Sequence, residues 1–170
     1  MGTDKALIEV DGRALALRVA DALRAAGCDP VVVVGDIPGL ASLGLPVLPD
    51  PPGLGRHPLA GVVAACALGP RVLTAPCDLP NLSPDDVRAL LAVDAPSEAQ
   101  VGDRRQPLLG VVEASRRDAL IAVAKTGGSA RSALAGRRAV QLPDRVAVNV
   151  NTPAELAMLQ APREDDHGER

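Results

Sequence analysis

Two kinds of apolar run alternate along most of the chain. The run PVVVVG at residues 30–35 is continuous and β-branched, which is typical of a strand buried on both faces of a parallel sheet. The run ALALRVADALRAAG at residues 14–27 repeats apolar positions at helical spacing and ends on a glycine, which is typical of a helix and its stop. This alternation of strands with helices predicts an α/β fold with a mostly parallel sheet.

The predicted elements follow one another without a low-complexity linker. Strands are expected at residues 6–10, 30–35, 45–50, 71–78, 106–114 and 145–151. Helices are expected at residues 14–27, 59–69, 83–93, 115–125 and 152–160, with a shorter one inside 127–136. We therefore expect one domain over residues 1–160, followed by a disordered acidic tail at 161–170.

Composition narrows the classes of function. The 170 residues carry a net charge of -3 and include no Phe, Tyr or Trp. This excludes the basic surface of a nucleic-acid or acidic-membrane binder, and a bound base would have no aromatic ring to stack on. The three cysteines have no C-x-x-C spacing, and no leader or membrane-length apolar run is present. We expect free thiols and a cytoplasmic location.

Ligands of parallel α/β sheets bind at the carboxyl ends of the strands, so strand-ending residues are the ones to inspect. Asp78 ends the run VLTAPCD and is suited to hold Mg²⁺, although a turn or helix-capping role fits it as well. Asp50 ends LPVLPD and could accept hydrogen bonds from a base, or be a solvated turn acid. His57 is the only histidine outside the tail, and no nucleophilic Ser or Cys motif accompanies it, so the sequence does not indicate a catalytic triad.

Other polar residues could contact a ligand, but each could also be an ordinary surface or loop residue. Lys5 is suited to neutralise phosphate charge, but an isolated lysine is more often a surface residue. Asn149 and Asn151 lie on the same side of a predicted strand, facing either a polar ligand or solvent. The stretch RRQ, which contains Arg105 and Gln106, could meet an anionic substrate or form a solvated loop.

Taken in order, several segments resemble one family. PLAG at residues 58–61, PCDLP at 76–80 and NVNTP at 149–153 together resemble the molybdenum cofactor guanylyltransferases, which are nucleotidyltransferases of the sugar-nucleotide type. The resemblance extends from Met1 to about Leu159. It implies a Rossmann-like three-layer α/β/α sandwich that transfers GMP from GTP to molybdenum-carrying molybdopterin, with Mg²⁺, and releases pyrophosphate.

The resemblance also implies roles for individual residues. Lys5 matches the family's phosphate-contacting lysine, Asp50 its guanine-contacting acid, and Asp78 its Mg²⁺ ligand. The residues that fall where the family meets the pterin are Arg105, Gln106, Asn149 and Asn151. The partners implied are GTP and molybdenum–molybdopterin, with transient contacts to other cofactor-biosynthesis proteins or molybdoenzymes, and neither nucleic acid nor membrane.

The start of the chain departs from the family pattern. Relatives have an apolar strand and a glycine-rich loop before the Asp4–Lys5 pair, of which only Met1 and Gly2 match here. We therefore expect the first strand of the sheet to be missing, either because Met1 is an internal codon or because the chain is a fragment with impaired activity. Alternative functions are a cytidylyltransferase or another NTP-transferase relative, and a non-catalytic remnant that binds molybdopterin or a protein partner.

Overall fold

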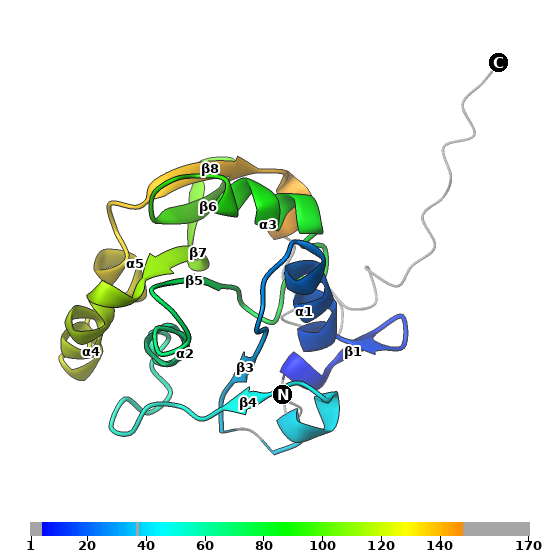
Figure 1. Ribbon diagram of the computed structural model, residues 1–170, viewed down its shortest axis with the longest axis horizontal. Coiled ribbons are helices and arrows are strands. Elements are labelled where there is room, and N and C mark those ends of the chain that lie inside the picture. Colours follow the sequence, from blue (N-terminus) through cyan, green and yellow to red (C-terminus); the bar gives the residue numbers. More distant parts are fainter. Residues whose placement is uncertain (1–4, 37, 148–170) are drawn as a thin grey trace.

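The computed structural model describes residues 5–36 and 38–147 of the chain (Figure 1). Its α-helices are α1 (Leu15–Ala25), α2 (Ala60–Ala65), α3 (Pro84–Leu91), α4 (Arg117–Lys125) and α5 (Ala130–Ala133). Its strands are β1 (Glu9–Val10), β2 (Arg13–Ala14), β3 (Val33–Val34), β4 (Val47–Leu48), β5 (Arg71–Thr74), β6 (Ser97–Val101), β7 (Arg104–Glu113) and β8 (Arg138–Leu142). Short 3-10 helices span Lys5–Leu7, Leu40–Leu43, Ala114–Arg116 and Asp144–Ala147.

The main sheet has four strands in the order β5-β7-β6-β8. Strand β7 runs antiparallel to both β5 and β6, while β8 is parallel to β6. Three of the four strands therefore point the same way, and β3 and β4 form a further parallel pair. The expected α/β fold with mostly parallel strands is confirmed, with β7 as the reversed strand.

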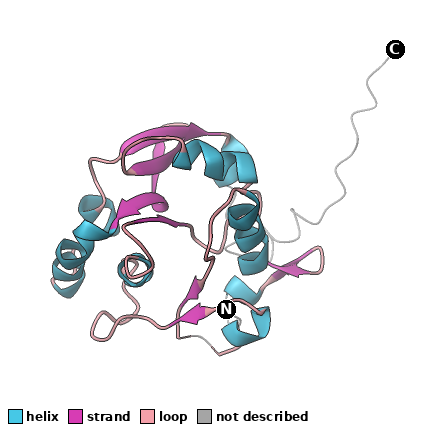
Figure 2. Cartoon of the chain, viewed as in Figure 1, coloured by secondary structure: helices cyan, strands magenta, loops and turns pink. Residues whose placement is uncertain are grey.

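Helices cover both faces of this sheet (Figure 2). Along β5 and β7, successive side chains point to opposite faces. Leu73 and Leu109 pack in one core with α1 and α3, whereas Val72 and Val112 pack in a second core with α2, α4 and α5. The result is a layered arrangement of helices, sheet and helices. None of the described helices is long and apolar enough to cross a membrane.

Strands β6 and β8 are not predicted by the sequence pattern because polar residues interrupt both of them. Strand β6 has the sequence SEAQV and β8 has RAVQL, so neither shows an apolar run. Glu98 on β6 is nevertheless buried, and it is paired with the buried Arg137 just before β8. An ion pair of this kind compensates the cost of burying charge, and it hides the strand from a hydrophobicity pattern.

Both predicted end strands differ from the structure. The strand expected at 6–10 is wrong in its first half, because Lys5–Leu7 forms a 3-10 helix. Its second half, β1, pairs with β2 through a turn in which Asp11 and Gly12 both have positive φ, as a two-residue hairpin requires. The strand expected at 145–151 is wrong at its start, which lies in the 3-10 helix Asp144–Ala147. Its remainder, the helix expected at 152–160 and the tail lie outside the described residues.

Candidate functional site

Lys5 and Asp78 meet at the carboxyl edge of β3 and β5. The Nζ atom of Lys5 lies 3.7 Å from Oδ2 of Asp78, and their side chains are 43% and 21% exposed. Ala6, which is buried, anchors the 3-10 helix that carries Lys5. The two residues line a cavity of about 190 Å³ together with Val33 and Val34 of β3. The structure therefore brings two of the predicted site residues together, with their charged groups open to a ligand.

Asp50 lines a second and larger cavity, of about 560 Å³. The loop that follows β4, residues 51–57, forms much of its wall, and Asp36 contributes a second carboxylate. Val34 lines both this cavity and the one beside Lys5. The acid predicted to contact a base and the pair predicted to meet phosphate and metal thus lie on either side of the end of β3.

The loop at 51–57 owes its shape to its glycines and to His57. Gly53 and Gly55 have φ values of +79° and +55°, which side chains rarely tolerate. The backbone N–H of Leu59 donates to Nδ1 of His57 over 3.1 Å, so the ring proton resides on Nε2, which donates to the carbonyl of Gly128 over 3.0 Å. His57 therefore ties the loop to the turn after α4.

Arg105 and Gln106 lie at the start of β7, away from these cavities. Arg105 forms an ion pair with Glu98 and donates to the carbonyl of Arg137. Arg137 is only 1% exposed and donates to three carbonyls, while burial lowers its pKa. Arg105 is thus partly committed to a structural network, although its side chain remains 42% exposed. Gln106 is half-buried.

Asn149 and Asn151 lie outside the described residues, but the segment leading to them is anchored. Arg145 donates to both carboxylate oxygens of Asp86, at 2.8 and 3.1 Å. Asp86 and Ser83 form the capping box at the start of α3. Burial raises the pKa of Asp86, but the hydrogen bonds from Arg145 and Ser83 outweigh this and leave it below its ordinary value.

Carboxylates are the candidate metal ligands near these cavities. The described residues contain no group of three or more His, Cys, Asp or Glu side chains placed to hold an ion. Cys28, Cys66 and Cys77 form no disulfide, and burial raises the pKa of the thiols of Cys28 and Cys66. Because thiolates are the form that binds metals and attacks substrates, these two cysteines are poor candidates for either role.

Asp36 lines the same cavity as Asp50, and the sequence carries a signal for its position. It directly follows the run PVVVVG, so it ends a strand as Asp50 and Asp78 do. The positioning role of His57 had no comparable signal, since its partner Gly128 is 71 residues away.

Known proteins match most of the chain. The family model described as the MobA-like NTP transferase domain matches residues 1–145. A molybdenum cofactor guanylyltransferase from Xanthomonas euvesicatoria pv. vesicatoria is 34% identical over 164 residues, which cover 96% of this chain and 85% of that protein. A protein of the same name from Rhodobacter capsulatus is 35% identical, over 92% of this chain and 86% of that protein.

Solved structures share the fold. Molybdopterin-guanine dinucleotide biosynthesis protein A from Archaeoglobus fulgidus superposes with a TM-score of 0.72 at 20% identity, over 94% of this chain and 90% of that chain. The 2-C-methyl-D-erythritol 4-phosphate cytidylyltransferase from Thermus thermophilus gives 0.63 at 20% identity, over 92% of each chain. These likenesses confirm the Rossmann-like nucleotidyltransferase fold.

Proposed function

Because the chain belongs to the MobA-like NTP transferase family, we propose that it transfers GMP from GTP to the molybdenum–molybdopterin cofactor and releases pyrophosphate. The observation that carries this proposal is the pairing of Lys5 with Asp78 at the carboxyl edge of β3 and β5. The Asp50 cavity adjoins it across Val34. Relatives at 34–35% identity named molybdenum cofactor guanylyltransferase support the same reaction.

In this proposal the two cavities hold two parts of one nucleotide. Asp50 accepts hydrogen bonds from the N–H groups of guanine, which offers donors that a carboxylate matches. Lys5 neutralises phosphate charge on the other side of Val34. Both side chains are partly exposed, so neither has to leave a packed core to meet the nucleotide.

Asp78 fits the role of a Mg²⁺ ligand. Its carboxylate is partly exposed, and Lys5 lies near one oxygen at 3.7 Å, beyond hydrogen-bonding distance. Mg²⁺ is commonly held by one or two carboxylates together with substrate phosphates and waters, so a single carboxylate is a sufficient protein donor set here. When bound, the ion supplies charge neutralisation at the reacting phosphates.

The chemistry requires no base from the protein. A phosphate oxygen of molybdopterin attacks the α-phosphorus of GTP, one P–O bond forms, and the bond to the β-phosphate breaks to release pyrophosphate. The attacking phosphate is already ionised at neutral pH, so no proton has to be removed. The protein's work is positioning and charge neutralisation, which suits Lys5 and the Asp78 carboxylate.

The pterin end of the site is the less constrained part of the proposal. The resemblance to the family assigns Arg105 and Gln106 to it, and the exposed guanidinium surface of Arg105 beside Glu98 is compatible with an anionic ligand. Asn149 and Asn151 complete the assignment from outside the described residues. The proposal includes a cytoplasmic location and transient contacts with other cofactor-biosynthesis proteins or molybdoenzymes.

The test is nucleotide transfer by the purified chain, with molybdenum–molybdopterin, Mg²⁺ and either GTP or CTP. We expect a GMP adduct and pyrophosphate with GTP, and neither when the metal is chelated. Asp50→Asn should lower the preference for GTP over CTP about tenfold or more, since a hydrogen bond to a charged group contributes about 1.5–3 kcal/mol.

Two outcomes would overturn the proposal. Transfer of CMP but not GMP would make the protein a cytidylyltransferase. Binding of molybdopterin without transfer from any nucleotide, by a chain shown to be folded, would make it a non-catalytic binding protein.

A further inference from the structure

The loop at residues 51–57 forms much of the wall of the Asp50 cavity, yet it contains neither helix nor strand. Inside the loop, the N–H of Leu54 donates to the carbonyl of Pro51 over 3.4 Å, and the N–H of His57 donates to the carbonyl of Leu54 over 3.3 Å. Two of its glycines have positive φ. Such a loop keeps one shape only when contacts with the rest of the fold offset the entropy cost of ordering it.

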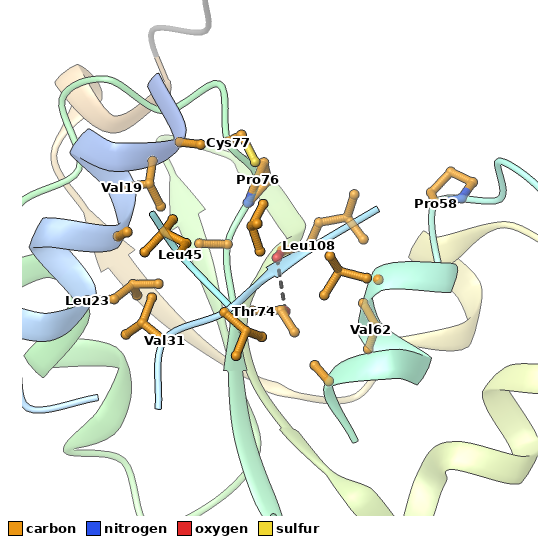
Figure 3. A pocket seen from close by; sticks show the side chains of 18 residues that line it. Val19, Leu23, Val31, Leu45, Pro58, Val62, Thr74, Pro76, Cys77 and Leu108 are labelled. Atoms are coloured by element: carbon orange, nitrogen blue, oxygen red, sulfur yellow. Dashed lines mark hydrogen bonds between the residues drawn. The ribbon is translucent and has the colours of Figure 1, made fainter. Parts of the chain in front are cut away.

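Leu54 is the apolar anchor of the loop. Its side chain is buried in the core that also contains residues of α2, α4 and α5. Pro58 and Val62, which follow the loop, line an apolar cavity of about 230 Å³ on the β3 side of α2 (Figure 3). Because apolar burial is non-directional, these contacts hold the loop against the fold without orienting its backbone.

His57 supplies directional contacts at the end of the loop. Its Nδ1 atom accepts from the N–H of Leu59 over 3.1 Å, and its Nε2 atom donates to the carbonyl of Gly128 over 3.0 Å. The first contact is local and supports the start of α2. The second joins residues 71 positions apart and reaches the turn between α4 and α5. Since His57 itself lines the Asp50 cavity, this second contact fixes part of the cavity wall.

The carbonyl of Gly128 is a well-held partner for this contact. The N–H of Gly128 donates to the carbonyl of Val123 over 2.9 Å, which closes the end of α4. A Cβ atom at Gly128 would lie 2.5 Å from Cγ1 of Val123, so the glycine fits closely against the helix. Helix α4 in turn packs with α2 in the core that holds Leu54. The bridge therefore connects the loop to a packed part of the fold.

The two contacts of His57 should have different consequences. A loop that already has its binding shape binds a ligand more tightly, because less freedom is lost on association. The bridge to Gly128 should therefore affect nucleotide affinity. Lys5 and Asp78 line the other cavity, so the rate of the chemical step should not depend on the bridge.

We propose that His57 is a positioning residue for the nucleotide, whose Nε2 bridge to Gly128 holds the loop at 51–57 in the shape that binds the guanine end of GTP. This inference rests on the proposed role of the Asp50 cavity as the base site. The Nδ1 contact with Leu59 supports the chain locally and does not set affinity.

The test separates the two ring nitrogens in the full chain. His57→Gln keeps a donor near the position of Nε2, whereas His57→Asn keeps an acceptor near the position of Nδ1. We expect the Kd and KM for GTP to rise about fivefold in His57→Asn, as for the loss of one neutral hydrogen bond, and to stay within about twofold in His57→Gln. The kcat should stay within about threefold in both, which marks a loss of binding alone.

Stability provides an internal control for this pair. Each variant loses one neutral hydrogen bond, so the two should unfold at similar urea concentrations. A difference in GTP affinity between them then cannot come from a difference in folding. Equal Kd values for GTP in folded His57→Asn and His57→Gln would overturn the inference.

Gly128→Ala breaks the same bridge from outside the cavity, because the added Cβ displaces the turn from Val123. Thr126→Ala is the matched control in the same turn, since the Thr126 hydroxyl donates to the carbonyls of Ala122 and Val123 within α4. We expect Gly128→Ala to raise the Kd for GTP about fivefold and Thr126→Ala to leave it within about twofold. Equal Kd values in these two variants would also contradict the bridge.

Amide hydrogen exchange without nucleotide tests the loop by itself. The amide of Leu54 should exchange about fivefold faster in His57→Asn and Gly128→Ala than in the parent and His57→Gln. Equal exchange in all four proteins would overturn the positioning role of His57. A parent chain that binds no GTP would contradict the proposed function, and the exchange of Leu54 would still decide whether His57 holds the loop.

Discussion

The four-stranded sheet and the separate β3–β4 pair differ in where they place their charged side chains. Around β5–β8 the strands form a continuous ladder between two apolar cores, and the buried charges Glu98 and Arg137 are paired. Around β3 and β4 the strands are two residues long and a smaller core supports them. The charged groups there, Lys5, Asp50 and Asp78, line cavities instead of packing inside.

This difference separates charged residues that stabilise the fold from charged residues that are placed to act on a ligand. Paired charges in a packed core stabilise one arrangement, and removing one partner leaves the other buried and uncompensated. Partly exposed charges that line cavities contribute little to folding and are placed where a ligand could contact them. We therefore expect substitutions in the four-stranded sheet to change stability, and substitutions beside β3 to change activity.

Arg137→Met should produce the largest effect, on stability. It removes the donor to three carbonyls and a partner of the 5%-exposed Glu98. The free energy of unfolding in urea should fall by about 3–5 kcal/mol. Arg138→Met, at the exposed neighbouring position, should change it by about 0.5 kcal/mol or less. Equal stability of the two variants would remove the contrast between buried support and exposed surface.

Asp78→Asn should lower kcat by roughly 10²–10³-fold, in line with the loss of a key electrostatic group. Its unfolding free energy should stay within about 1 kcal/mol of the parent, because the ion pair with Lys5 is partly exposed. Asp118→Asn on α4, where the carboxylate is 97% exposed, serves as the control. Unchanged Mg²⁺-dependent turnover in Asp78→Asn would exclude Asp78 from the site.

Lys5→Ala should reduce kcat/KM for GTP by about tenfold to a hundredfold, since one phosphate-neutralising charge is lost. The only other lysine in the sequence, Lys125, ends α4 and is exposed, so Lys125→Ala is a matched loss of charge. If both variants lowered kcat/KM equally, general electrostatic attraction would account for the effect, and a specific contact of Lys5 with phosphate would be contradicted.

Asp86→Asn should have the smallest effect, confined to acid stability. The pKa of Asp86 is lower in the folded state than in the unfolded chain, so its contribution is present above about pH 4 and is lost as pH falls toward the lowered value. The parent should lose about 1 kcal/mol more than Asp86→Asn between pH 5 and pH 3, an amount typical of a capping interaction. Parallel curves of unfolding free energy against pH would contradict this assignment.

Apolar periodicity was sufficient to predict α1 and the buried run at β3, because their side chains face a core directly. It did not predict β6, whose burial of Glu98 depends on an arginine 39 residues later. The alternation of elements predicted the α/β class, but the reversed direction of β7 is set by its hairpin with β6. That hairpin could not be predicted because β6 itself has no apolar pattern.

In the candidate site, too, features set by local sequence were predictable and features set by distant contacts were not. Strand-ending acids were predictable, since their position follows from local sequence, and the structure brings Lys5 beside Asp78 as an ion pair. The role of His57 and the engagement of Arg105 by Glu98 were not predictable, because each depends on contacts made by the folded chain.

The central claim is that the nucleotide binds at the end of β3, between the Asp50 cavity and the Lys5–Asp78 pair. Its most direct test is an NMR titration of the assigned chain with GTP and Mg²⁺. We predict that the amide signals of residues 34–36, 50, 53–57 and 77–78 shift, and that those of Glu98 and Arg137 do not. Shifts concentrated around Glu98 and Arg137, with none beside β3, would contradict the account.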